Sequence, residues 1–386
     1  MLALRLARGA HPLILARRLM VAAASAGVGF LLLSALTYAL AHPGESSASL
    51  LRLSWCLIPL AATVHFAVAV ARTDPSTRPR SGLSAVGLGP GRLALLAASS
   101  TAVSGTLGSM VALLFFLHLR GDLAGLPFDG AAAELLAADE PLPLAAALTL
   151  LALVPLAATV AAALTLRPRP VEPEPAAPGG PAGPRRAPGG LPWGCALTAA
   201  GLAVGTYAGR SHAGDPLPLP GEIDGNPVGV LVGWALTAVG LAIAGPALTH
   251  FCGRLLQMFR PGALRLLAGR ILMEESRRIG RPLGVVCAVA SALIAAWTLY
   301  DEGPRPFGPL TGLGASLVVA CTTATLLTSA LEARAARAAT VQDLRRLGAS
   351  AGTLRSAAAL RAGVLLLVLT PLTWGVATLA AVPLKG

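Results

Sequence analysis

The feature that most constrains this chain is a series of long apolar runs separated by short charged or proline-rich segments. A helix needs about 20 apolar residues to cross a hydrocarbon layer of ~30 Å, and these runs are close to or above that length. We therefore predict nine membrane spans, at 20–41, 53–71, 97–118, 143–165, 191–209, 228–251, 283–300, 310–331 and 362–383. The span at 191–209 is the weakest of them, because it is short and rich in glycine.

Composition agrees with this pattern and excludes a soluble fold. Hydrophobic residues make up 55% of the 386 residues, charged residues only 12%, and the mean hydropathy is +0.70. Such a chain has too few polar side chains to cover a surface in water. The predicted fold class is an all-α, polytopic integral membrane protein with about nine transmembrane helices in two degenerate repeats.

The net charge of +12 would suggest nucleic acid as the partner of a soluble protein. In a membrane protein it is explained by the excess of arginine on cytosolic loops. With the N-terminus in the cytosol, the arginine-rich segments fall inside and the acidic loop 119–142 falls outside. We predict a multi-pass protein of the cell membrane with a cytosolic N-terminus, an extracytoplasmic C-terminus and no nucleic-acid partner.

No motif for catalysis, for a metal or for a cofactor is found. The five cysteines are scattered without zinc-ligand spacing, and no glycine-rich phosphate loop is followed by Lys-Ser or Lys-Thr. None of the 18 acidic residues lies within a predicted span, whereas ion-coupled transporters place carboxylates there. We predict that the chain is not an enzyme, has no cofactor, and would receive the energy for any transport from a partner.

An internal repeat organises the chain. MLALRLARGAHPLILARRL at 1–19 resembles an amphipathic helix at the membrane surface, and a similar pattern returns as LRLLAGRILMEESRR at 264–278. Each copy then enters a span, crosses an outer loop, returns and reaches a bend centred on glycine. The predicted domains are a first repeat of four spans, a Pro/Gly-rich cytosolic linker, a connecting pair of spans and a second repeat of three spans, at 1–165, 166–190, 191–253 and 254–386.

The two bends are the candidate sites for a soluble partner. In the second bend Gly348 suits the left-handed residue that ends a helix, and Ser350 suits the cap of the next helix. Charged flanks around an apolar tip favour docking into a groove of a soluble protein. The alternative is an arginine-rich loop that contacts anionic lipid. The candidate docking residues are Leu344, Arg345, Arg346, Leu347, Gly348, Ala349 and Ser350 in the second bend, and Ser84, Val86, Gly87, Leu88 and Gly89 in the first.

His65 is the one ionisable side chain well inside a predicted span. It is a possible intramembrane polar site, either a substrate contact or a group that senses pH. The alternative is a neutral histidine that forms a hydrogen bond to a neighbouring helix.

In its arginine-rich surface helices and its bends, the chain resembles the FtsX-like permease family, the membrane subunits of one class of ABC transporter. The resemblance lies in the arginine-rich surface helix before a span, and in LRRLGAS at 344–350 followed by Leu354-Arg355. It implies a non-catalytic permease that couples ATP hydrolysis by a separate ATPase dimer to the export or extraction of a hydrophobic, lipid or peptide substrate. It also implies contacts with membrane lipid, and either a second permease chain or a homodimer.

Two other hypotheses stay open at this point. In the first, the protein is a membrane scaffold or sensor that transports nothing, and its bends bind a regulatory partner. In the second, it is a membrane-embedded enzyme that acts on lipid, with His65 and the carboxylates of the outer loops as candidate groups.

Overall fold

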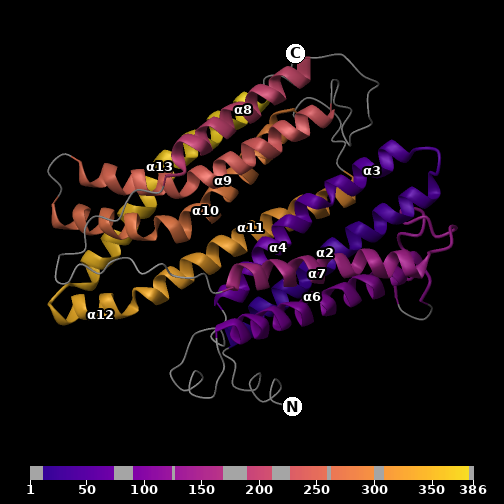
Figure 1. Ribbon diagram of the computed structural model, residues 1–386, viewed down its shortest axis with the longest axis horizontal. Coiled ribbons are helices and arrows are strands. Elements are labelled where there is room, and N and C mark those ends of the chain that lie inside the picture. Colours follow the sequence, from indigo (N-terminus) through magenta and orange to yellow (C-terminus); the bar gives the residue numbers. More distant parts are fainter. Residues whose placement is uncertain are drawn as a thin grey trace. The chain divides into compact units, whose positions relative to one another are not determined.

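The computed structural model describes residues 12–73, 90–123, 127–167, 189–210, 227–258, 262–299 and 308–381, and among these residues it contains helices and turns but no strand. The helices are long rods (Figure 1). They are α2 (Pro12–Ala41), α3 (Ser46–Trp55), α4 (Leu57–Thr73), α6 (Pro90–Arg120), α7 (Leu144–Leu166), α8 (Leu191–Arg210), α9 (Pro227–Gln257), α10 (Ala263–Leu299), α11 (Pro309–Ala336), α12 (Ala338–Arg346) and α13 (Ala351–Ala381).

Within the described residues, eight helical segments are long and apolar enough to cross a membrane. The prediction of an all-α, polytopic membrane protein is therefore confirmed. The helix α8 coincides with the weak predicted span at 191–209, but it is not among the eight. The count of nine spans, the side of the membrane on which each terminus lies and the internal repeat stay predictions.

The contacts between helices divide the chain into two units. Unit 1 contains α2, α3, α4, α6, α7 and the part of α11 up to Thr325, and unit 2 contains α8, α9, α10, α12, α13 and the part of α11 from Leu326. The continuous helix α11 thus contributes to both units. This division does not follow the boundaries of the predicted repeats, which stay a prediction.

The core of unit 1 is built around α2, which packs against α4, α6 and α7. The ring of Phe30 lies 6.1 Å from that of Phe115 and 5.7 Å from that of Phe116. Hydroxyl groups join the helices where they approach closely: Ser25 Oγ donates a hydrogen bond of 2.9 Å to the carbonyl oxygen of Gly105. Small and hydroxylated residues allow this type of packing inside a membrane, where no water competes for the hydrogen bond.

Unit 2 is built around α9, which packs against α8 on one side and α10 on another. Glycines line both contacts. A Cβ atom added at Gly201 of α8 would lie 2.5 Å from the backbone nitrogen of Thr237 of α9, and one added at Gly269 of α10 would lie 2.6 Å from the carbonyl oxygen of Gly253. The backbones of these helices are therefore in direct contact, and no larger residue fits between them.

The helix α10 corrects one part of the sequence analysis. The surface helix predicted at 264–278 and the span predicted at 283–300 are parts of one helix, Ala263–Leu299, with Pro282 inside it. The proline does not end the helix, because neighbouring helices can support a proline within a membrane segment. Glu275, which we had placed on a surface helix, is consequently part of a candidate membrane span.

The glycine contact between α8 and α9 is testable by adding a single methyl group. We expect Gly201→Ala to lower the free energy of unfolding by about 1–3 kcal/mol, because the new Cβ overlaps backbone atoms. The matched control is Gly363→Ala in α13, where an added Cβ meets no atom within 4 Å. The control should raise the stability by up to about 1 kcal/mol, because alanine is the better helix former. Thermal unfolding of the purified variants in detergent measures both, and equal midpoints would contradict the contact.

Candidate functional site

The second bend contains a short exposed helix, α12, between the long helices α11 and α13. No residue of α12 is buried. Val341 and Leu344 are half-buried, while Arg345 and Arg346 are exposed. The residue that follows α12, Leu347, is 84% exposed and forms an apolar tip. We call the exposed residues from Val341 to Ser350 the α12 surface.

Local hydrogen bonds fix the geometry of this bend. Gly348 has φ +94°, in the left-handed region that favours glycine. Its N–H donates to the carbonyl oxygen of Arg345 at 3.0 Å, and the N–H of Ala349 donates to that of Leu344 at 2.9 Å. This pair of hydrogen bonds is a Schellman motif, which ends a helix sharply. The N–H of Thr353 donates to Ser350 Oγ at 3.2 Å, so both the predicted helix end and the predicted cap are confirmed.

The structure brings the candidate residues of the second bend together. Leu344, Arg345, Arg346, Leu347, Gly348, Ala349 and Ser350 all lie on the turn from α12 into α13. Asp343 and Arg346 approach to 3.8 Å, but both are well exposed, so this ion pair contributes little to stability. The candidates of the first bend lie outside the described residues: Ser84, Val86, Gly87, Leu88 and Gly89.

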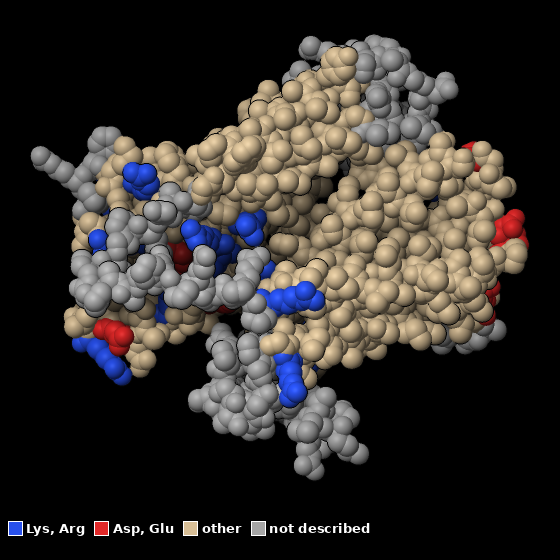
Figure 2. All heavy atoms as spheres, in the orientation of Figure 1, with Lys and Arg blue, Asp and Glu red and all other residues tan. Residues whose placement is uncertain are grey.

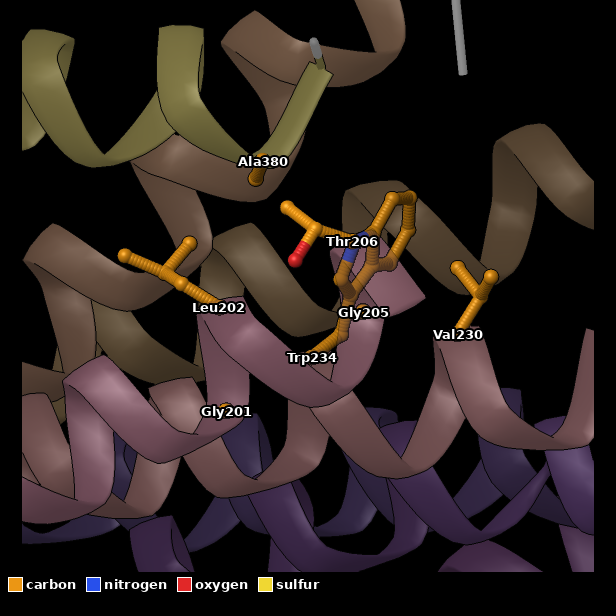
Figure 3. Close-up of a pocket in the computed structure, with 7 residues that line it drawn as sticks. All are labelled: Gly201, Leu202, Gly205, Thr206, Val230, Trp234 and Ala380. Atoms are coloured by element: carbon orange, nitrogen blue, oxygen red, sulfur yellow. The ribbon is translucent and has the colours of Figure 1, made fainter. Parts of the chain in front are cut away.

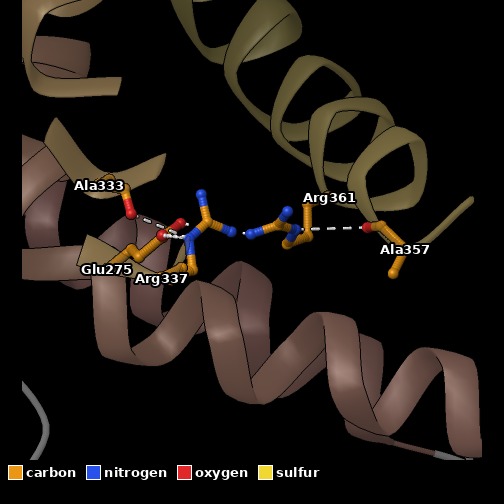
Figure 4. Close-up of polar contacts among 5 residues, drawn as sticks. All are labelled: Glu275, Ala333, Arg337, Ala357 and Arg361. Atoms are coloured by element: carbon orange, nitrogen blue, oxygen red, sulfur yellow. Dashed lines mark hydrogen bonds and ion pairs between the residues drawn. The ribbon is translucent and has the colours of Figure 1, made fainter. Parts of the chain in front are cut away.

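The sequence analysis missed the buried ionic group beneath this bend (Figure 4). The carboxylate of Glu275, on α10, is 8% exposed and forms ion pairs with two arginines. Arg337, the residue directly before α12, reaches one carboxylate oxygen through its Nε. Arg361, on α13, reaches the other oxygen through Nη1 at 3.3 Å. We call Glu275, Arg337 and Arg361 the ionic triad.

Each arginine of the triad also bonds to its own helix. Arg337 Nε donates to the carbonyl oxygen of Ala333 at 3.1 Å, and Arg361 Nε donates to that of Ala357 at 3.3 Å. A buried carboxylate is costly unless it is paired and hydrogen-bonded, so the positions of the three helices that supply the triad are coupled. The start of α12 is thereby fixed to both α10 and α13.

A weak signal for Glu275 is present in the sequence. Ala268, Leu272 and Ser276 are buried on α10, and Glu275 lies at helical spacing from them, on the same face. An acidic residue on the apolar face of a helix predicts a buried ion pair. The two basic partners are distant in the chain, and the sequence gives no means to select them from the many arginines.

His65 lies in unit 1, on the exposed side of α4, next to the buried Phe66. A metal site is not supported by the described residues, among which no group of three His, Cys, Asp or Glu side chains could hold an ion.

One small pocket lies between α8, α9 and α13 in unit 2 (Figure 3). Its volume is about 10 Å³, which is room for about one water molecule. It therefore cannot serve as a site for a lipid or peptide. Its lining consists of Gly201, Leu202, Gly205, Thr206, Val230, Trp234 and Ala380.

Comparisons with family models, with curated proteins and with solved structures found no match to this chain. The resemblance to FtsX-like permeases thus rests on the sequence pattern alone. The exposed α12 surface and the ionic triad beneath it form the candidate functional site.

The geometry of the bend is testable at its glycine. Gly348→Ala keeps open space around the new Cβ but places it on a left-handed residue, at a cost of about 1 kcal/mol or more. We expect the amides of residues 348 and 349 to exchange with deuterium about fivefold faster, because the two hydrogen bonds that end α12 weaken. Gly352→Ala, in the first turn of α13, is the control and should leave these rates unchanged. Equal exchange in both variants would contradict the motif.

Proposed function

We propose that this protein is a permease subunit of the FtsX-like ABC type. In this proposal a separate ATPase dimer docks on the α12 surface, and the membrane helices use the work to export or extract a hydrophobic, lipid or peptide substrate. The assembly contains the ATPase dimer and either this chain alone, a second permease chain or a second copy of this chain. One observation carries the proposal: α12 is exposed along its length, while Arg337, the residue directly before it, is held in a buried ion pair with Glu275.

The exposed part of the α12 surface has the chemistry of a docking site. Arg346 has a side chain that is 73% exposed, Arg345 is exposed beside it, and Leu347, the next residue, is exposed as well. An apolar tip with basic flanks is complementary to an apolar groove with an acidic rim. A segment that served only to connect α11 and α13 would not need an exposed apolar side chain, whereas Leu347 is 84% exposed.

The ionic triad gives docking a mechanical consequence. Arg337 precedes α12 directly, so a displacement of α12 pulls on its ion pair with Glu275. Because Arg361 binds the same carboxylate, the displacement acts on α10 and α13 together. A buried ion pair resists separation, since each charge left alone would be poorly solvated. Motion of a docked partner would therefore be delivered to two apolar helices.

A second candidate function is a membrane scaffold or sensor whose α12 surface binds a regulatory partner. The observation that favours it is the exposed α12 surface itself, because its apolar tip and basic flanks would fit the groove of a regulatory protein as well as that of an ATPase. Both candidates use the same surface, and the identity of the bound partner separates them.

Charge reversal tests the proposed docking. We expect Arg345→Glu with Arg346→Glu to lower the amount of ATPase that co-purifies with the full chain by at least about tenfold, because like charges then meet the acidic rim of the partner. The control is Arg277→Glu with Arg278→Glu, which changes the net charge equally at exposed positions of α10. Co-purification assays with tagged protein in mild detergent measure both variants.

Three outcomes are informative. Loss of the ATPase in the first variant alone supports the permease. Equal recovery from both variants contradicts docking on the α12 surface. Recovery of a non-ATPase regulator from the wild type, lost in the first variant, supports the scaffold or sensor instead.

A further inference from the structure

The ionic triad carries an unbalanced charge. Two guanidinium groups share the single carboxylate of Glu275, which leaves one net positive charge. The side chains of Arg337 and Arg361 are 25% and 15% exposed, so water reaches this charge only in part. A bound anion would supply a second negative partner for the two guanidinium groups.

The triad also has hydrogen-bond donors that no described residue uses. Both terminal nitrogens of Arg337 and Nη2 of Arg361 donate to no described residue. Figure 4 shows the terminal nitrogens of the two arginines directed toward one another, with Glu275 at one side. Paired guanidinium groups with free terminal nitrogens match the oxygens of a phosphate group.

The charged side chains around the triad also favour the binding of an anion. Basic side chains gather at the end of unit 2 that carries α12 (Figure 2). From residue 254 to 361 the exposed arginines are Arg254, Arg265, Arg270, Arg277, Arg278, Arg281, Arg334, Arg345, Arg346 and Arg355, whereas the described acids are Glu274, Glu275, Glu332 and Asp343. The potential around the triad is therefore positive, which attracts anionic headgroups to a membrane protein.

From these observations we propose that Arg337 and Arg361, each oriented by its hydrogen bond to a backbone carbonyl, form a binding site for a phosphate group, that of an anionic lipid headgroup or of a free phosphate ion. The proposal does not depend on the proposed permease function. It assigns to Glu275 a role that limits the affinity, because its carboxylate competes with the phosphate for the same two arginines.

Because Glu275 competes with the phosphate, replacing Glu275 and replacing either arginine should change the affinity in opposite directions. Native mass spectrometry of the full chain, titrated in detergent with phosphatidylglycerol, measures how many lipids bind and how tightly. We expect Arg337→Gln and Arg361→Gln, singly, to weaken the tightest site at least about tenfold each, the factor for a charged hydrogen bond. Glu275→Gln should instead tighten this site by a similar factor, since both arginines are then free for the phosphate. A purely structural ion pair predicts no gain from Glu275→Gln.

Two further arms and a control complete the experiment. Inorganic phosphate should bind to the same arginines, and phosphatidylcholine should not occupy the tight site. The control is Arg265→Gln with Arg270→Gln, at exposed positions of α10, where the affinity should change less than about twofold. Tighter binding of phosphatidylglycerol would assign the site to a lipid headgroup, and equal affinity for inorganic phosphate and phosphatidylglycerol would assign it to a free phosphate ion. Unchanged or weaker binding by Glu275→Gln would overturn the site altogether, and this single variant decides the matter if an arginine variant fails to fold.

Discussion

The ion pairs of one buried carboxylate determine the arrangement at the end of unit 2. Glu275 is 8% exposed on an otherwise apolar face of α10, where an unpaired carboxylate would be very unfavourable. Its two partners are Arg337, the residue directly before α12, and Arg361 of α13. The requirement to keep both pairs therefore fixes where α12 starts relative to α10 and α13. The exposed α12 surface has a defined position only because this buried group holds its base.

The sequence predicted what depends on neighbouring residues. Apolar runs predicted the helices, and Gly348 with Ser350 predicted the end of α12 and the cap of α13, because one helical turn contains all the atoms involved. The ionic triad depends on residues up to 86 positions apart, and nothing in the chain marks which arginines meet Glu275. The continuous helix α10 was missed for a related reason: its charged first half resembles a surface helix until its neighbours are known. Tertiary contacts decided both features.

Contacts at glycines pack three helices of unit 2, α8, α9 and α10, closely together. α8, α9 and α10 approach one another closely at Gly201, Gly253 and Gly269, with the side chains of Met273 and Gln257 packed beside the last two glycines. The interior of a protein packs at the density of an organic crystal and transmits strain. The packing of α10 against α9 and of α9 against α8 therefore joins these three helices of unit 2 into one group.

The helix α11 extends this reasoning beyond unit 2. It is continuous from Pro309 to Ala336 and leads directly to Arg337. Its earlier part belongs to unit 1, where Cys321 lies in a buried cluster with Phe66 and 3.6 Å from Thr63 Oγ1. Hydrogen bonds along its axis make a helix stiff in that direction. The continuous helix α11 thus joins the packing around Cys321 to the residue that precedes α12.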